Sequence, residues 1–87
     1  MCAIFGMMIK EPDPSMVGKF FNGFAHLQHR GQESAGVAYS DGEDVWIHKG
    51  MGLIQSVFGR DLTKKENVIE EIINKKPLMI IGQTRYS

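Results

Sequence analysis

The apolar positions of the chain fall into short runs and spaced patterns that predict different elements. Residues 3–9 are almost purely apolar, which is typical of a buried strand. Residues 35–40 and 45–49 are also strand-like, and the polar residues 41–44 between them predict a hairpin turn. A last apolar run over residues 78–82 predicts another buried strand, which leads into the polar residues 83–87.

Between the first two predicted strands the apolar spacing becomes helical. Asp13 and Pro14 form an N-cap followed by proline in the first helical position. The residues that recur at helical spacing are Val17, Phe20, Phe21, Phe24 and Leu27. They predict a helix that runs to about His29. Gly18 and Gly23 weaken it by up to about 1 kcal/mol each, unless close packing requires them.

A second helix is predicted near the end of the chain. Thr63 and Glu66 match a capping box, and Pro77 ends the segment. Its apolar face consists of Val68, Ile69, Ile72 and Ile73. Residues 29–34 are expected to form a polar loop and residues 54–58 a short helical turn. The order strand, helix, hairpin, helix, strand predicts an α+β fold.

Composition limits the function classes. The 87 residues make one small domain at most, and ten basic residues balance ten acidic ones. A net charge of zero removes the electrostatic argument for a nucleic-acid partner or an anionic membrane. The apolar residues 78–81 are too few to span a bilayer, and no signal peptide is evident. We expect a cytoplasmic protein whose single cysteine, Cys2, stays reduced.

Cys2 directly follows the initiator methionine and becomes the first residue if Met1 is removed. Its α-amine would then titrate at about pH 7.7–8.0 and could serve as general base for its own thiol. On position alone, the interpretation of Cys2 as an ordinary small apolar residue near a terminus is the favoured one.

Four segments in order decide between these interpretations. Met-Cys-Ala-Ile-Phe-Gly at the start resembles the Cys-Gly-Ile-(Phe/Val)-Gly start of class II, N-terminal-nucleophile glutaminases. Residues 27–37 (LQHRGQESAGV) are similar to the loop that follows their first helix. Residues 49–58 (KGMGLIQSVF) resemble the amidophosphoribosyltransferase branch of this family. Residues 81–87 (IGQTRYS) are similar to the family's Gly-His-Thr-Arg-Tyr-Ser-Thr-Ala-Gly.

The resemblance implies a role for each matching residue. Cys2 would attack the glutamine side-chain amide to give a glutamyl thioester and ammonia, for purine biosynthesis. Arg85 would hold the α-carboxylate of glutamine, which a planar guanidinium fork suits. Arg30 would lie near the nucleophile and help shield it, with Gly31 supplying a tight turn. A structural role for Arg30 stays equally open.

Other candidate sites are weaker. His26 and His29 have a spacing that could hold a metal, but no further ligands accompany them in the sequence. Gly50-x-Gly52 lacks the lysine and the glycine spacing of a phosphate loop. We therefore expect no metal and no cofactor.

The chain departs from the family pattern in several places. Ala3 replaces the usual glycine, so its Cβ could crowd the substrate or block a backbone angle that glycine takes easily. Gln83 stands in place of the usual histidine. The Asn-Gly oxyanion hole and the Asp that contacts the substrate amine would lie beyond Ser87. While Met1 is retained, Cys2 has no free amine.

These departures leave the enzymatic activity open. We expect residues 1–87 to form a truncated glutaminase domain: a partial N-terminal-nucleophile hydrolase-like sandwich, with an antiparallel sheet and two main helices. One face of the sheet would remain apolar, which predicts a homo-oligomer or a complementing chain. The expected small-molecule partner is glutamine. The alternative is a catalytically inactive relic that acts as a binding or assembly module.

Overall fold

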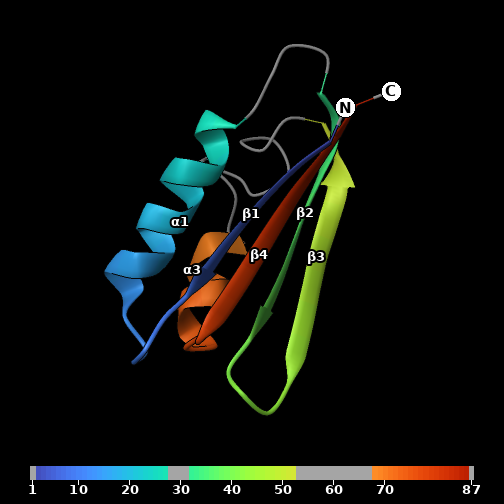
Figure 1. Ribbon diagram of the computed structural model, residues 1–87. Helices are drawn as coiled ribbons and strands as arrows, with labels where there is room; N and C mark the ends of the chain where they lie inside the picture. The colour runs from blue at the N-terminus through green and yellow to red at the C-terminus, as the bar shows by residue number, and fades with distance from the viewer. Residues whose placement is uncertain (1, 28–31, 53–67, 87) are drawn as a thin grey trace.

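The computed structural model describes residues 2–27, 32–52 and 68–86, which form four strands and two helices. Two helices lie on one side of a single sheet (Figure 1). The elements in chain order are β1 (Cys2–Met8), α1 (Pro14–His26), β2 (Gln32–Ser40), β3 (Val45–Met51), α3 (Val68–Asn74) and β4 (Met79–Tyr86). The predicted α+β class and element order are confirmed.

The sheet is antiparallel throughout and has the strand order β1-β4-β2-β3. The last strand therefore lies between the first strand and the β2–β3 hairpin, with Gly82 paired to Phe5 on one side and to Val37 on the other. Because β4 has partners on both sides, it continues to Tyr86, and the prediction that the strand ends at Gly82 is wrong. Likewise β2 begins at Gln32, so part of the predicted loop 29–34 is strand.

Helix α1 begins where the sequence predicts. The Asp13 carboxylate accepts hydrogen bonds from the Ser15 backbone N–H at 2.9 Å and the Ser15 hydroxyl at 2.7 Å. The hydroxyl bond, followed by the backbone bond, lowers the pKa of Asp13. The helix ends at His26, three residues earlier than predicted, and the backbone N–H of Leu27 donates to the Phe24 carbonyl at 3.0 Å.

The hairpin between β2 and β3 is held by one aspartate. The Asp41 carboxylate accepts hydrogen bonds from the backbone N–H groups of Asp44 and Glu43, both at 2.9 Å. These two bonds, that from Asp44 first, lower the pKa of Asp41. Gly42 has a φ of 100°, which favours glycine because it has no Cβ. The predicted turn is confirmed.

The hydrophobic core lies between α1, α3 and the covered face of the sheet. Phe20 and Phe24 are fully buried, and their rings pack with centroids 5.6 Å apart. A Cβ on Gly82 would lie 2.8 Å from the Phe24 ring, and one on Gly23 would lie 2.7 Å from the Phe5 ring. Gly23 and Gly82 therefore allow the helix to approach the sheet, whereas Gly18 has no such neighbour within 4 Å.

Helix α3 covers the part of the same face that lies near Tyr39 of β2 and Trp46 of β3. Ile72 is fully buried, and Val68, Ile69 and Ile73 pack against the core, as the predicted apolar face requires. The predicted capping box at Thr63 and Glu66 and the predicted turn at residues 54–58 lie outside the described residues. Pro77 is buried after the helix has ended at Asn74.

An aromatic stack joins this helix end to the hairpin. The Tyr39 and Trp46 rings stack with centroids 5.5 Å apart, and the Lys75 ammonium lies 5.1 Å from the centre of the Trp46 ring. Tyr39 and Trp46 form a cross-strand aromatic pair, and Lys75 adds a cation–π contact to the Trp46 ring. Burial raises the pKa of Tyr39, and nearby Glu71 raises it further.

Candidate functional site

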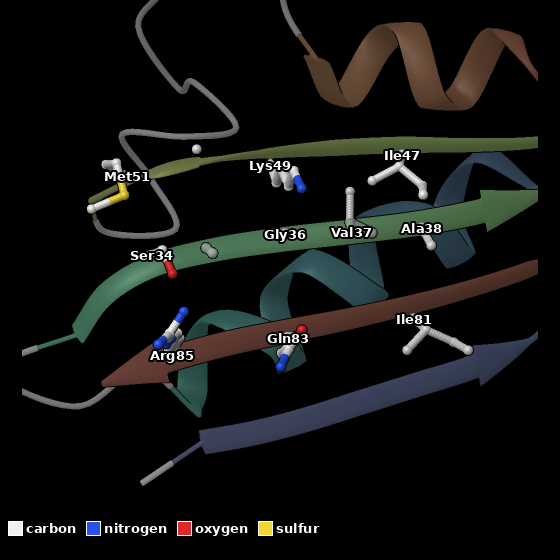
Figure 2. Close-up of a pocket in the computed structure, with 12 residues that line it drawn as sticks. Ser34, Gly36, Val37, Ala38, Ile47, Lys49, Met51, Ile81, Gln83 and Arg85 are labelled. Atoms are coloured by element: carbon white, nitrogen blue, oxygen red, sulfur yellow. The ribbon is translucent and has the colours of Figure 1, made fainter. Parts of the chain in front are cut away.

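The face of the sheet opposite the helices is hollowed by a groove of about 710 Å³ (Figure 2). The groove follows β2, whose side chains on this face are small. The floor is formed by Ser34, Gly36 and Ala38, and the walls by Ile81, Gln83 and Arg85 of β4 and by Ile47, Lys49 and Met51 of β3. The alternation of side chains along each strand puts these residues on one face and the core residues on the other.

Strand register brings the two main predicted site residues together. Cys2 of β1 is the direct partner of Arg85 of β4, and Arg85 is the partner of Ser34 of β2. Directly opposed residues in an antiparallel pair have Cα atoms about 4.5–5.5 Å apart. Residues from the two ends of the sequence thus meet in one row across the sheet, beside a register shift between Gln32 and Ser34.

The groove has a cationic end and an apolar end. Arg85, Ser34 and Met51 lie at one end of Figure 2, Ile47 and Ile81 lie at the other, and Lys49 lies between them on β3. Arg85 and Lys49 are exposed, and the described residues of this face include no acidic side chain. An arginine fork and a lysine ammonium can bind a carboxylate here, and the apolar end can accommodate a hydrocarbon chain.

The departures from the family pattern have different structural consequences. Ala3 alternates with Ile4 and lies on the helix-facing side of β1, opposite Thr84. Its φ is not in the left-handed region, so the expectation that its Cβ blocks a backbone angle that glycine takes easily is wrong. The expectation that its Cβ crowds the substrate stays a prediction. Gln83 stands on the wall of the groove, one pleat from Arg85.

Arg30 and Gly31 lie outside the described residues, as does His29. The Nδ1 atom of His26 lies 2.6 Å from the backbone carbonyl of Asn22, on the exposed side of α1. Within the described ranges no group of three or more His, Cys, Asp or Glu residues could hold a metal ion. No helix among the described residues is long and apolar enough to cross a membrane.

Two residues of the groove were missed by sequence reasoning. Ser34 was assigned to a loop, and Lys49 was predicted at the end of a strand and within a segment similar to the family, without a role in the site. Both residues can be placed in the groove once β2 is paired with β3 and β4. Lys49 is the partner of Gly36, and Ser34 is the partner of Arg85. Counting alternate residues along each strand would have given their face, but the pairing was needed to bring them beside Arg85. Thr84 is also notable, because its buried hydroxyl has no hydrogen-bond partner among the described residues.

Comparison with known proteins relates 99% of the chain to amidophosphoribosyltransferases. No family model matches the chain. It is 46% identical over 86 residues to the amidophosphoribosyltransferase of Bacillus subtilis and 38% identical over 86 residues to that of Synechocystis. These alignments cover 99% of this chain but only 16% and 15% of the two relatives.

Solved structures agree. The B. subtilis glutamine phosphoribosylpyrophosphate amidotransferase, complexed with ADP and GMP, superimposes with a TM-score of 0.66 at 35% identity. That match covers 100% of this chain and 16% of the solved chain. A second structure, described as the allosteric regulatory enzyme of purine biosynthesis, gives a TM-score of 0.65. The chain is thus related over its whole length to about a sixth of amidophosphoribosyltransferase, consistent with the N-terminal, class II glutamine amidotransferase part of that family.

Proposed function

We propose that this chain is the opening portion of a class II glutaminase domain, which binds glutamine in the groove and releases ammonia from its side-chain amide. The observation that carries the proposal is the register in which Cys2, the candidate nucleophile, is the direct partner of Arg85, the candidate carboxylate ligand. A nucleophile and a bidentate cation one strand apart are suited to a short amino acid that carries a carboxylate at one end and an amide at the other.

Each residue has a distinct part in the proposed reaction. Removal of Met1 gives Cys2 a free α-amine, which takes the proton from its thiol. The sulfur attacks the amide carbon of glutamine, and the C–N bond breaks as the nitrogen takes up a proton and leaves as ammonia. The γ-glutamyl thioester that remains is hydrolysed by water to glutamate and the free thiol. Arg85 holds the α-carboxylate throughout, so the amide reaches the sulfur in a fixed orientation.

The relatives suggest what the ammonia is for. Their names describe transfer of an amide nitrogen to a phosphoribosyl group, and one solved structure is described as an enzyme of purine biosynthesis. Since this chain spans only about a sixth of those proteins, the acceptor chemistry is proposed for a larger assembly rather than for residues 1–87.

The experiment is labelling by an electrophilic glutamine analogue, followed by intact-mass spectrometry. We expect protein without Met1 to gain a single adduct, and Cys2→Ser protein to gain none. Arg85→Lys keeps the charge but loses the planar fork, so labelling should slow by roughly tenfold or more, from the loss of a charge-assisted bidentate contact. Lys19→Gln, on the exposed surface of α1, is the control and should label at the normal rate.

A parallel reaction with iodoacetamide, which needs only a reactive thiol, separates the pocket from the nucleophile. Arg85→Lys should leave this rate unchanged if Arg85 acts on glutamine. Equal slowing of both reagents would count against the assignment of Arg85. An unmodified mass in protein that lacks Met1 would reject the glutaminase proposal and favour the inactive binding or assembly module.

A further inference from the structure

Gly36 interrupts a row of side chains that crosses the open face of the sheet, which is the face opposite the helices. It is the direct partner of Gln83 on β4 and of Lys49 on β3, and the three residues lie in one row across the strands (Figure 2). Gln83 and Lys49 are exposed, whereas Gly36 has no side chain between them. A notch is thus left over the backbone of Gly36, with a polar side chain on either side.

The notch exists because residue 36 is a glycine. A Cβ at this position would lie 3.2 Å from the Lys49 Cβ and 3.7 Å from the His48 carbonyl oxygen. The first distance is shorter than an ordinary van der Waals contact, so a larger residue would fill the notch and press on β3. The φ of Gly36 is not in the left-handed region, so the backbone angle does not require glycine. What glycine provides here is space.

Strand register places Arg85 within reach of the notch. Arg85 pairs with Ser34, so Gly36 is its diagonal neighbour, at a Cα distance of roughly 7–8 Å that long side chains can span. A carboxylate over Gly36 can therefore meet the Arg85 guanidinium on one side and the Lys49 ammonium on the other. The described residues of the open face include no acidic side chain that would compete with it.

The length of glutamine favours the same place. Its α-carboxylate and amide carbons are joined by four carbon–carbon bonds, which span roughly 5 Å when extended. Cys2 and Arg85 are direct partners, with Cα atoms only about 4.5–5.5 Å apart, so little room remains between them for a ligand. Gly36 lies two strands and two residues from Cys2, which is roughly 12 Å at the usual strand spacing and rise. This longer span has room for both the ligand and the nucleophile.

We propose that Gly36 and Lys49 complete the glutamine site. The α-carboxylate lies in the notch between Arg85 and Lys49, and the amide extends toward Cys2. This carboxylate subsite rests on the proposed function and specifies how its substrate is held. Gly36 supplies the space and Lys49 a second positive charge, while the neutral Gln83 can donate a hydrogen bond. The subsite selects free glutamine over glutamine whose carboxylate is amidated or linked in a peptide.

Calorimetric titration of Cys2→Ser protein with L-glutamine and with its α-amide tests the subsite without the reaction. Glutamine should bind at least about tenfold more tightly than the α-amide, which has a similar shape but no negative charge. Lys49→Gln should weaken glutamine binding several-fold, as expected of an exposed ion pair, and leave the α-amide unchanged. Lys19→Gln makes the same change on the exposed surface of α1 and should alter neither constant.

Substitutions around the notch separate space from charge. Gly36→Ala should weaken glutamine and the α-amide alike, by about tenfold or more, because its methyl group fills the notch for both. Gly18→Ala, which meets no atom within 4 Å, is its control. Gln83→Glu keeps the shape of residue 83 but adds a negative charge, and should weaken glutamine by about tenfold while sparing the α-amide. Urea unfolding checks that each variant is folded.

The carboxylate subsite and the glutaminase reaction can fail separately. Glutamine binding of normal strength in both Gly36→Ala and Lys49→Gln would overturn the subsite, even if labelling of Cys2 supported the glutaminase. Equal affinity for glutamine and its α-amide would overturn it too. Loss of binding in these variants, together with no labelling of Cys2 in protein that lacks Met1, would support the subsite and reject the reaction.

Discussion

The two faces of the sheet differ in what their apolar residues contact, although they are built from the same strands. On the covered face Ile80 is fully buried beneath the helices, and on the open face its neighbour Ile81 is 42% exposed. Both faces carry large hydrophobic residues, so composition alone does not distinguish them. The difference shows that the covered face supplies the stability of the described fold, whereas the open face is available for binding.

The neighbouring isoleucines give the sharpest test of this comparison. Ile80→Ala should lower the free energy of unfolding by about 2–5 kcal/mol, since it leaves a cavity under α1 and α3. Ile81→Ala shortens a side chain that is 42% exposed and leaves no enclosed cavity, so it should cost about 1 kcal/mol or less. Urea unfolding of dilute protein, monitored by circular dichroism, measures both. Equal costs for the two substitutions in dilute solution would mean that the faces do not differ as described.

The glycines provide a second comparison, with a smaller expected effect. Gly82→Ala on β4 would bring a methyl group to 2.8 Å from the fully buried Phe24 ring, and should cost about 1–3 kcal/mol of unfolding free energy. Gly18→Ala on α1 meets no such atom within 4 Å and should stabilise the helix by up to about 1 kcal/mol. Shifts of the urea midpoint at unchanged slope would measure the two effects.

A shorter side chain on the helix checks the mechanism. In the Phe24→Leu background, Gly82→Ala should cost less than it does alone, because the ring atoms that it meets are gone. Simple additivity of the two substitutions would mean that the strain arises elsewhere.

Local chemistry explains which parts of this arrangement could be predicted. The Asp13 cap, the phenylalanine spacing of α1 and the Asp41 turn depend on neighbouring residues, so the sequence was sufficient for them. The length of β4 was not predictable in the same way, because Gln83 and Arg85 are polar and only pairing with β1 and β2 extends the strand. The strand order has the same origin, since it joins residues far apart in the chain.

The site shows the same division. Cys2 and Arg85 were each identified by resemblance, but their meeting across β1 and β4 is a property of the register. Ser34 and Lys49 were missed because their place depends on two strand pairings at once. The prediction that Ala3 blocks a special backbone angle failed because Ala3 takes an ordinary strand conformation in its pairing with Thr84.

The smallest expected effect concerns the exposed carboxylates that cap α1 and the hairpin. Their folded-state pKa values lie below the unfolded value of about 3.9, so their contribution to stability is present above that pH and is lost as the pH falls through the folded value. Asp13→Asn and Asp41→Asn keep an acceptor oxygen but cannot titrate, so each should flatten the acid limb of a plot of urea midpoint against pH. Ser15→Ala removes the hydroxyl that contributes most to the Asp13 shift and should flatten the limb partly. An acid limb that is the same in all three variants would mean that other groups govern acid unfolding, and would separate the caps from the stability of the covered face.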